Sequence, residues 1–474
     1  MPGNSSSKSV GRRLRELSPE NPTRKNSPTA DATHGEVIDA LRKLVDRSIR
    51  RHADHVKVRT GIRRPIEEVV SGSYVETASG PVFVSTTRYA LKQPLGPSAP
   101  GLIELDRECP SALCGISGGR NLCGAPLSRL VYLDTETTGL ATTSGTYAFL
   151  VGLGFMEGDV FRVDQIYMRD HADEPALLQL LGDRLREFDG MVTYNGRSYD
   201  IPLLQARFIT NREFNPPLPV EHLDLLYAAR RLWKGRNTGC RLIELEQEIL
   251  GITREGDIPG HLIPGLYFDA IRTDDASHMA PVFHHNRLDI TSLAALTIQA
   301  SRLLNPESYQ SEGFDLEWRG EDVAGAARVF EKLGLQETTF IYRSALDGKF
   351  RVEDHKYELL CRLSRIHRRE GDTENVLPLL EQVISDGGCY RPYALIERAK
   401  LLEHGDADYE TAHQLTNAAI SILSELGTAY NVSYEFRVSL DAAHHRLRRL
   451  EARKAGLPWH PGTHTDDSVD DFSF

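Results

Sequence analysis

The chain has 474 residues, which favours two or three domains, and its 40% hydrophobic and 26% charged residues are typical of a folded globular protein. No stretch of the sequence approaches the roughly 18 consecutive apolar residues that a membrane-spanning helix needs. The formal net charge of −11 argues against indiscriminate coating of nucleic acid, but it leaves room for a local basic track.

The first part of the chain carries few folding signals. Residues 1–35 are rich in serine, proline and charge and lack an apolar signal-peptide core, so we expect a disordered leader and a cytoplasmic protein. Residues 36–128 combine a helix and basic run (36–64), a hairpin around Ser79-Gly80, and a linker rich in glycine and proline. The basic run could touch phosphates, but a charged run is more often a solvated face.

Three of the six cysteines, Cys109, Cys114 and Cys123, fall in this linker. Without a signal peptide, we expect reduced thiols. Zinc sites usually have paired, closely spaced ligands, and the gaps between these cysteines are loose. Buried or loop thiols are therefore the preferred interpretation, and a structural metal is the alternative.

The sequence pattern changes at Arg129, where a predicted α/β domain, residues 129–306, begins. A short apolar run ends at Asp134, and two further apolar runs complete a predicted meander of three antiparallel strands. A helix, a fourth strand and another helix follow in the order typical of layered α/β folds. The pattern predicts a mixed sheet flanked by helices.

The last third of the chain is predicted to be helical. Residues 320–453 have helical spacing of apolar residues, interrupted at Gly334, Gly371 and Gly405. The spacing of these breaks fits stacked helical hairpins of the tetratricopeptide kind, which could bind a partner protein. A plain helical bundle is the alternative. Residues 454–474 are expected to form a disordered acidic tail.

Four carboxylates fall in three short motifs. The first motif, DTETTGL, places Asp134 and Glu136 on the same face of a strand, because side chains alternate along it. The second, NGRSYD, ends with Asp200 at a strand–helix junction. The third, HHNRLD, places His285 one helical turn before Asp289. Crowded carboxylates repel one another unless a cation lies between them, and Mg²⁺ or Mn²⁺ prefers such oxygen ligands.

In this order and with these separations, the motifs resemble the three exonuclease motifs of the DEDD superfamily of ribonuclease H-like nucleases. More narrowly, residues 130–305 resemble the YprB-like ribonuclease H-like proteins. Supporting stretches are LDLLYAARRLW, CRLIELEQEILGI, Arg254-Glu255 and Asp257-Ile-Pro-Gly260. The resemblance implies an α/β ribonuclease H-like mixed sheet followed by an all-α tetratricopeptide-like domain. It also implies a 3′→5′ exonuclease that acts on the 3′ end of DNA or RNA.

The resemblance also implies a role for each motif residue. Asp134 would ligate both of two metal ions and Glu136 one of them. Asp200 and Asp289 would complete the set of four metal-binding carboxylates. The implied two-metal mechanism stabilises the attacking and leaving oxygens, while a histidine takes a proton from the attacking water. The usual spacing of histidine bases points to His284, whereas the Asn-x-x-Asp pattern favours His285. We rank His285 first.

Further residues are candidates for substrate contacts. By family analogy, Thr137 and Leu140 would shape the pocket for the terminal nucleotide, and Asn195 would hydrogen-bond near the metals. Asp224 could be a fifth carboxylate of the site, but a structural role, tying the following helix to the sheet, is preferred.

A basic segment with one aromatic ring lies between the second and third motifs. Arg231, Trp233 and Lys234 could grip single-stranded nucleic acid, with cations on the phosphates and the ring stacked on a base. The alternative places Trp233 in the core and leaves the cations on a solvated face.

Two other functions fit the same motifs. One is an endonuclease of the same fold, and the other is a non-catalytic scaffold that binds nucleic acid and a protein partner. A missing carboxylate would favour the scaffold, and none is missing. The choice between DNA and RNA depends on contacts to the 2′-hydroxyl, for which no residue can be named from the sequence.

Overall fold

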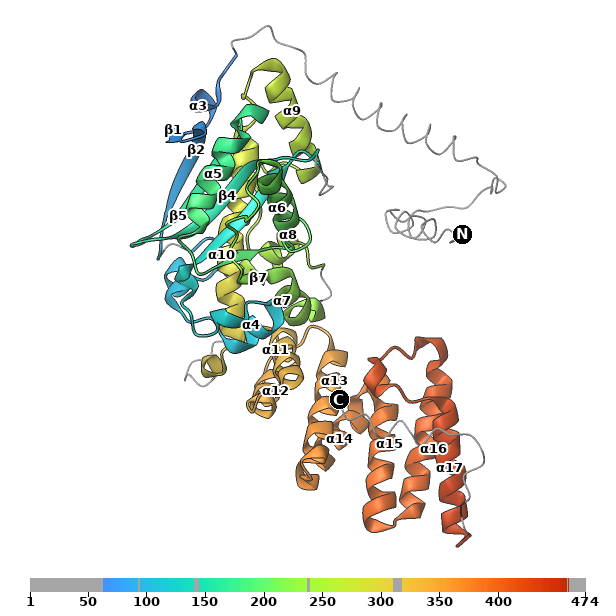
Figure 1. Cartoon of the computed structure of the whole chain (residues 1–474). Helices are drawn as coiled ribbons and strands as arrows, with labels where there is room; N and C mark the ends of the chain where they lie inside the picture. Colours follow the sequence, from blue (N-terminus) through green and yellow to red (C-terminus); the bar gives the residue numbers. More distant parts are fainter. Residues whose placement is uncertain are drawn as a thin grey trace, which may run out of the picture. The chain divides into compact units, whose positions relative to one another are not determined.

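A computed structural model describes residues 63–457, apart from 93, 140–144, 237–238 and 310–317, together with Trp459 (Figure 1). The predicted leader, the helix and basic run up to residue 62, Leu140 and most of the acidic tail lie outside the described residues.

A seven-stranded mixed sheet forms the centre of the first part, in the order β1-β2-β5-β4-β3-β6-β7. The strands are β1 (Ser73–Thr77), β2 (Gly80–Ala90), β3 (Leu130–Thr137), β4 (Ala148–Glu157), β5 (Val160–Tyr167), β6 (Gly190–Thr193) and β7 (His222–Asp224). Along this order, the neighbouring strands β1, β2, β5, β4 and β3 pair antiparallel, whereas β3, β6 and β7 pair parallel. The predicted hairpin and meander are confirmed, but β2 pairs with β5, so the sheet begins before the boundary predicted at residue 129.

Helices cover both faces of this sheet (Figure 1). Because side chains alternate along β3, Leu130 and Tyr132 pack into one core while Val131 and Leu133 pack into another. The first core includes side chains of α4 (Ser111–Ser117), α7 (Leu225–Leu232), α8 (Leu242–Leu245) and much of α10 (Ala280–Leu303). The second includes side chains of α3 (Ile66–Val69), α5 (Glu174–Leu185), α6 (Asp200–Thr210) and α9 (Ile263–Thr273). The predicted mixed sheet flanked by helices is confirmed.

The segment expected to be an irregular linker is packed into the first core. Leu102, Leu105 and Leu113 are fully buried there. Its elements are short 3₁₀ turns and α4, so the sequence correctly predicts the absence of long elements. The interpretation as a linker is wrong, because the segment buries apolar side chains against α7 and α10.

A helix-rich region follows the sheet. Its helices are α11 (Gly320–Leu333), α12 (Thr338–Leu346), α13 (Glu353–Arg369), α14 (Thr373–Asp386), α15 (Arg391–Leu401), α16 (Tyr409–Leu426) and α17 (Leu440–Lys454). Each packs against the next along the chain. Gly334 and Gly371 have left-handed backbones at the predicted breaks, whereas near the third break the left-handed residue is Ala407 rather than Gly405. The tetratricopeptide-like character of the region stays a prediction.

Helix α11 packs directly on α7. A Cβ atom placed on Gly325 would lie 2.2 Å from the carbonyl oxygen of Leu232, so only glycine permits this approach. Beside it, Arg236 Nε donates to Asp322 Oδ1 at 2.7 Å, and both side chains are buried. The first helices of the helical region therefore share a core with the sheet domain.

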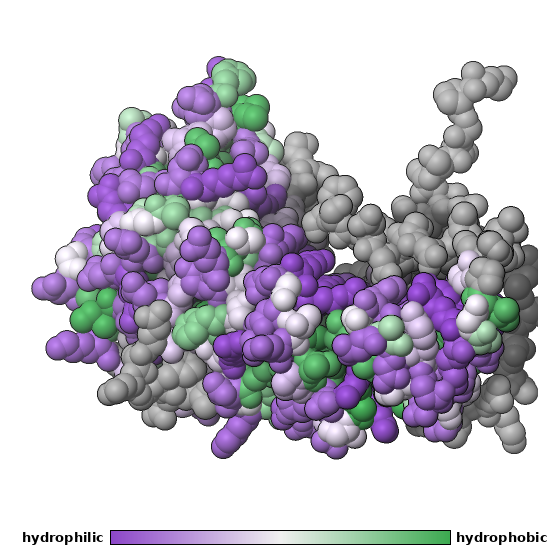
Figure 2. Space-filling model, turned by 90° about the horizontal axis from the view of Figure 1, so that it is seen from below, coloured by the Kyte–Doolittle hydropathy of each residue, from purple (hydrophilic) through white to green (hydrophobic). Residues whose placement is uncertain are grey.

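The surface in Figure 2 is mainly hydrophilic, and its hydrophobic residues occur in small separate groups. Among the described helices, none combines the length and the apolar character needed to cross a membrane.

Candidate active site

Strand β3 carries the first two carboxylates. Asp134 and Glu136 lie two residues apart and point to the same face of the sheet, as predicted. On the neighbouring strand, Gly152 is the register partner of Asp134, and a Cβ atom there would lie 2.3 Å from Asn286 Oδ1. Gly152 thus allows α10 to approach the sheet at the position of the carboxylates.

Asp200 begins α6 and joins the same group. Its Oδ1 accepts a hydrogen bond from Thr135 Oγ1 at 2.5 Å, which links it to the strand that carries Asp134 and Glu136. A carboxylate in the first turn of a helix is also favoured by the helix dipole. The strand–helix junction predicted from the NGRSYD motif is therefore confirmed.

The turn before Asp200 is held by Asp224. Asn195 has a left-handed backbone (φ 65°), a conformation that asparagine tolerates better than most residues. The backbone N–H groups of Asn195 and Arg197 donate to Asp224 at 2.8 and 3.2 Å, and Asp224 also caps α7 through Leu226 N–H. The predicted structural role of Asp224 is confirmed.

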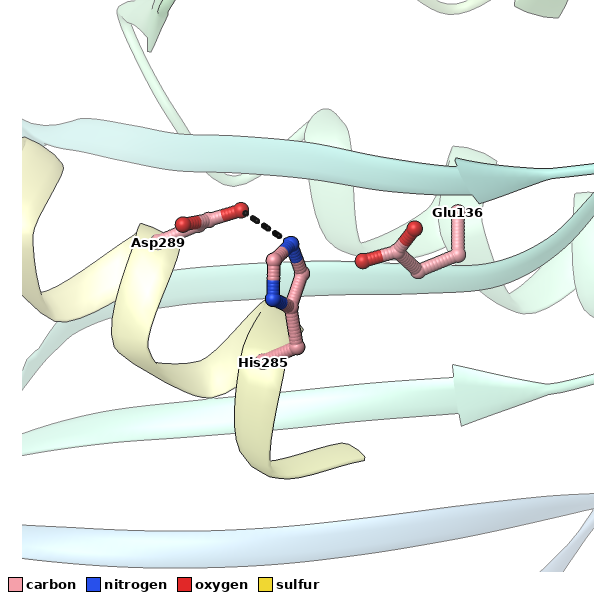
Figure 3. Close-up of side chains that lie close together, drawn as sticks. All are labelled: Glu136, His285 and Asp289. Atoms are coloured by element: carbon pink, nitrogen blue, oxygen red, sulfur yellow. Dashed lines mark ion pairs between the residues drawn. The ribbon is translucent and has the colours of Figure 1, made fainter. Parts of the chain in front are cut away.

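Helix α10 brings the third motif to the carboxylates. His285 and Asp289 are one turn apart, with Nε2 and Oδ2 separated by 3.5 Å. One ligand atom from each of Glu136, His285 and Asp289 lies within 4.8 Å of the others (Figure 3). His284 instead lies beside Arg287, with its Nδ1 3.1 Å from the guanidinium. Of the two histidines, His285 lies in this cluster.

Asn286 fixes the position of Asp134. Its Nδ2 donates to Asp134 Oδ2 at 2.9 Å, and its Oδ1 accepts from Gln165 Nε2 at 2.9 Å. Asn286 is fully buried, and Gln165 is nearly so. A buried chain of two side-chain amides therefore orients the first carboxylate from behind.

Arg254 supplies a positive charge inside the site. Its guanidinium bonds to both oxygens of Glu246, at 2.5 and 2.6 Å, to Asp257 at 3.0 Å, and to Asp289. Its side chain is only 4% exposed. Without a metal, this residue neutralises part of the negative charge of the cluster.

Burial and mutual repulsion raise the pKa of the clustered carboxyls. Desolvation comes first for Asp134, followed by the charges of Asp289, Glu136 and Asp200. Desolvation and the charges of Asp289 and Asp200 raise the pKa of Glu136 well above its usual range. Desolvation also raises the pKa of Asp289 despite Arg254, and that of Asp200 to about 6 despite the bond from Thr135. Hard oxygen donors crowded in this way fit a divalent cation, which would relieve both effects.

The predicted substrate-binding residues differ in burial and in hydrogen bonding. Thr137 uses its hydroxyl within its own turn, donating to the carbonyl of Gly139 at 2.9 Å. Trp233 is 3% exposed and packs in the first core, so it cannot stack on a base and its prediction as a stacking platform is wrong. Arg231 is half-buried and donates to the carbonyl of Tyr227, whereas Lys234 is exposed.

The cysteines show no metal-site geometry in the described part of the chain. Cys109 and Cys114 are buried, with their sulfurs 3.2 Å apart, while Cys123 is exposed. The three thiols are not grouped as closely as the ligands of one ion, in contrast to the cluster around Glu136.

Residues that orient the site were not recognised as such from the sequence. Glu246, Arg254 and Asp257 all lie in stretches that support the family resemblance but carry no predicted role. A buried arginine among three acidic partners leaves no periodic signal in the sequence. The only available signal was the coincidence of Arg, Asp, Pro and Gly in a short segment, which is typical of an ordered loop.

The metal-free protein is expected to become more stable, relative to an Asp200→Asn variant, as the pH falls from neutral to about 5. The pKa of Asp200 is raised in the fold to about 6, so its ionisation costs stability in full above that pH, and this cost falls as the pH drops from about 6 toward the ordinary aspartate pKa of 3.8. Thermal unfolding in EDTA measures the gap between the two proteins at each pH. Saturating Mn²⁺ should raise the melting temperature of the unmodified chain more than that of the variant. A difference in melting temperature that does not depend on pH or metal would contradict this interpretation.

Two comparisons place the chain among known proteins. The family model described as the RNase_H superfamily matches residues 131–301, which span the sheet domain from β3 to α10. The uncharacterized protein YprB of Bacillus subtilis (strain 168) is 32% identical over 318 residues, which cover 65% of this chain and 73% of that protein. The similarity therefore extends well beyond the matched domain, and the chain belongs to the YprB family and contains an RNase_H superfamily domain.

Proposed function

We propose that this protein is a metal-dependent 3′→5′ exonuclease that hydrolyses phosphodiester bonds of single-stranded nucleic acid. The observation that carries the proposal is the cluster of Glu136, His285 and Asp289, together with Asp134, whose pKa is raised by burial and by the charges of Asp289, Glu136 and Asp200. Membership of the RNase H superfamily supports a nuclease activity.

Each residue has a chemical task in this proposal. The four carboxylates would hold two Mg²⁺ or Mn²⁺ ions, which supply Lewis-acid stabilisation of the attacking and leaving oxygens. The imidazole of His285 accepts a proton from the attacking water, since it is the histidine nearest to Glu136 and Asp289. Asn286 holds Asp134 in place through its side-chain amide.

The exposed Lys234 remains available to a phosphate, whereas Trp233 is not available to a base. Thr137 and Asn195 stay part of the proposed substrate contact, because Thr137 directly follows Glu136 and the turn at Asn195 leads into Asp200. The helical region α11–α17 is proposed to bind a protein partner.

A pair of substrates with one sequence separates the exonuclease from an endonuclease of the same fold. Linear single-stranded DNA and RNA are expected to be degraded with Mn²⁺, while the covalently closed circles of the same sequence stay intact. The Glu136 and histidine pattern supports this outcome, because it resembles end-processing nucleases. Gel electrophoresis of both substrates provides the measurement. Linearised circles would identify an endonuclease instead.

A further inference from the structure

The loop between α8 and α9 places a carboxylate behind His285. The oxygens of Asp257 lie 2.8 and 3.0 Å from Nδ1 of the imidazole, on the side of the ring away from Asp289. The side chain of Asp257 is 9% exposed and that of His285 is 17% exposed. The contact is therefore made largely out of solvent.

The loop that carries Asp257 is fastened to the domain. It follows a π-helical turn, Glu246–Leu250, and Gly251 and Gly256 adopt left-handed backbones within it. Arg254 ties the loop back to this turn through the buried pair with Glu246. Single π-turns often occur at functional sites, and this one anchors the base of the loop.

All the acceptor positions of Asp257 are used by its neighbours. Oδ1 accepts from the backbone N–H of Ile258 at 2.9 Å and faces His285, while Oδ2 accepts from Arg254 at 3.0 Å. Burial acts to raise the pKa of this carboxyl, but the hydrogen bonds from Arg254 and His285 prevail and lower it. Asp257 is thus an ionised acceptor held in one orientation, and a role as a fifth metal ligand would break these bonds.

The two neighbours of Nδ1 require opposite tautomers of the ring. An ionised carboxylate only accepts, so the 2.8 Å contact with Asp257 requires a proton on Nδ1. The guanidinium of Arg254 only donates, so a bond from it would require a bare Nδ1, but that contact is longer, at 3.4 Å. The same Arg254 nitrogen already donates to Asp257 at 3.0 Å. The geometry therefore selects the ring with hydrogen on Nδ1.

We propose that Asp257 is a positioning residue that holds His285 with its proton on Nδ1, so that the lone pair of Nε2 faces the carboxylate cluster. The proposal deepens the proposed function and rests on it for its consequence in catalysis. Buried carboxylates behind functional histidines orient the ring and increase its basicity, and removing them commonly costs about 10- to 100-fold in activity or metal affinity.

The tautomer can be measured without any nuclease activity. Long-range proton–nitrogen NMR spectra of the full chain, labelled with ¹⁵N-histidine and recorded without metal at alkaline pH, distinguish the two neutral forms. The signal of His285 is assigned by its loss in His285→Gln. We expect Nδ1 protonation in the unmodified chain and a shift toward the other tautomer in Asp257→Ala. Nε2 protonation in the unmodified chain would overturn the proposal.

Kinetics with Mn²⁺ and a single-stranded substrate supply the second readout. Asp257→Ala is expected to lower kcat by about 10- to 100-fold with little change in KM, and Asp257→Asn, which keeps an acceptor for the ring, should recover part of the loss. Asp269→Asn is the matched control, because Asp269 pairs with Arg272 on the exposed side of α9. An unchanged kcat in Asp257→Ala would refute the proposal. Should no nuclease activity be found, the proposed function fails, while the NMR result still decides the role of Asp257.

Discussion

Replacing Asp134 by asparagine is expected to slow nucleic-acid cleavage by about a thousandfold or more, which corresponds to about 4 kcal/mol of lost transition-state stabilisation. Asparagine still accepts the hydrogen bond from Asn286, so the side chain should keep its place while losing its charge. Initial rates with Mn²⁺ on a labelled single strand measure the effect. A rate within about tenfold of the unmodified chain would show that Asp134 does not hold a catalytic ion.

The same substitution should have the opposite effect on stability. Desolvation and three neighbouring carboxylates raise the pKa of Asp134, so its charge destabilises the metal-free fold at neutral pH. Removing that charge is expected to raise the melting temperature in EDTA and to reduce the further rise on adding Mn²⁺. The exposed Asp269→Asn variant provides the control and should behave like the unmodified chain in both assays. A melting temperature of Asp134→Asn below that of the unmodified chain in EDTA would contradict this explanation.

Replacing Arg236 by alanine is expected to reduce the free energy of unfolding by about 3–5 kcal/mol. Arg236 forms two hydrogen bonds to Asp322, at 2.7 and 2.5 Å, and another to the carbonyl of Glu248. The side chain of Asp322 is fully buried, so the substitution leaves an unpaired charge in the core between the sheet domain and α11. Urea unfolding followed by circular dichroism measures the loss.

A surface pair of the same chemistry is the control. Arg186 and Asp183 lie 2.6 Å apart on the exposed end of α5, with both side chains 59% exposed. Arg186→Ala should cost less than about 1 kcal/mol, because exposed ion pairs contribute little. Equal losses for the two variants would mean that the Arg236–Asp322 pair does not hold the helical region to the sheet domain.

The carboxylate site could be predicted from the sequence because strand and helix periodicity are local. Asp134 and Glu136 are two positions apart on a strand, and His285 and Asp289 are one turn apart on a helix, so each pair shares a face of its element. The junction at Asp200 was also visible, since an apolar strand runs into a helical pattern there. The structure brings these three local features together along β3.

The residues that position these carboxylates and the histidine could not be predicted in the same way. Gly152, Gln165 and Arg254 act through contacts between segments distant in sequence, and no periodicity marks them. Gly152 matters only because Asn286 lies opposite, across 134 residues of chain. Such contacts depend on the register of α10 against the sheet, which is a tertiary property.

Trp233 illustrates the opposite error. Its basic neighbours suggested an exposed ring, but amphipathic helices often carry arginine and lysine beside a buried aromatic residue. Arg236, from the same segment, is likewise buried and pairs with Asp322 of the helical region. Local composition could not distinguish a substrate-binding patch from an interface between two parts of the chain, because both use cations and an aromatic ring.

The most direct test of the account is the product released from a 3′-labelled single strand. With Mn²⁺, the unmodified chain is predicted to release the label as nucleoside 5′-monophosphate, without shorter labelled oligonucleotides, for DNA, RNA or both. EDTA and Asp134→Asn should abolish the release. No cleavage of either substrate, together with retained metal-dependent binding, would contradict the account and identify a nucleic-acid-binding scaffold instead.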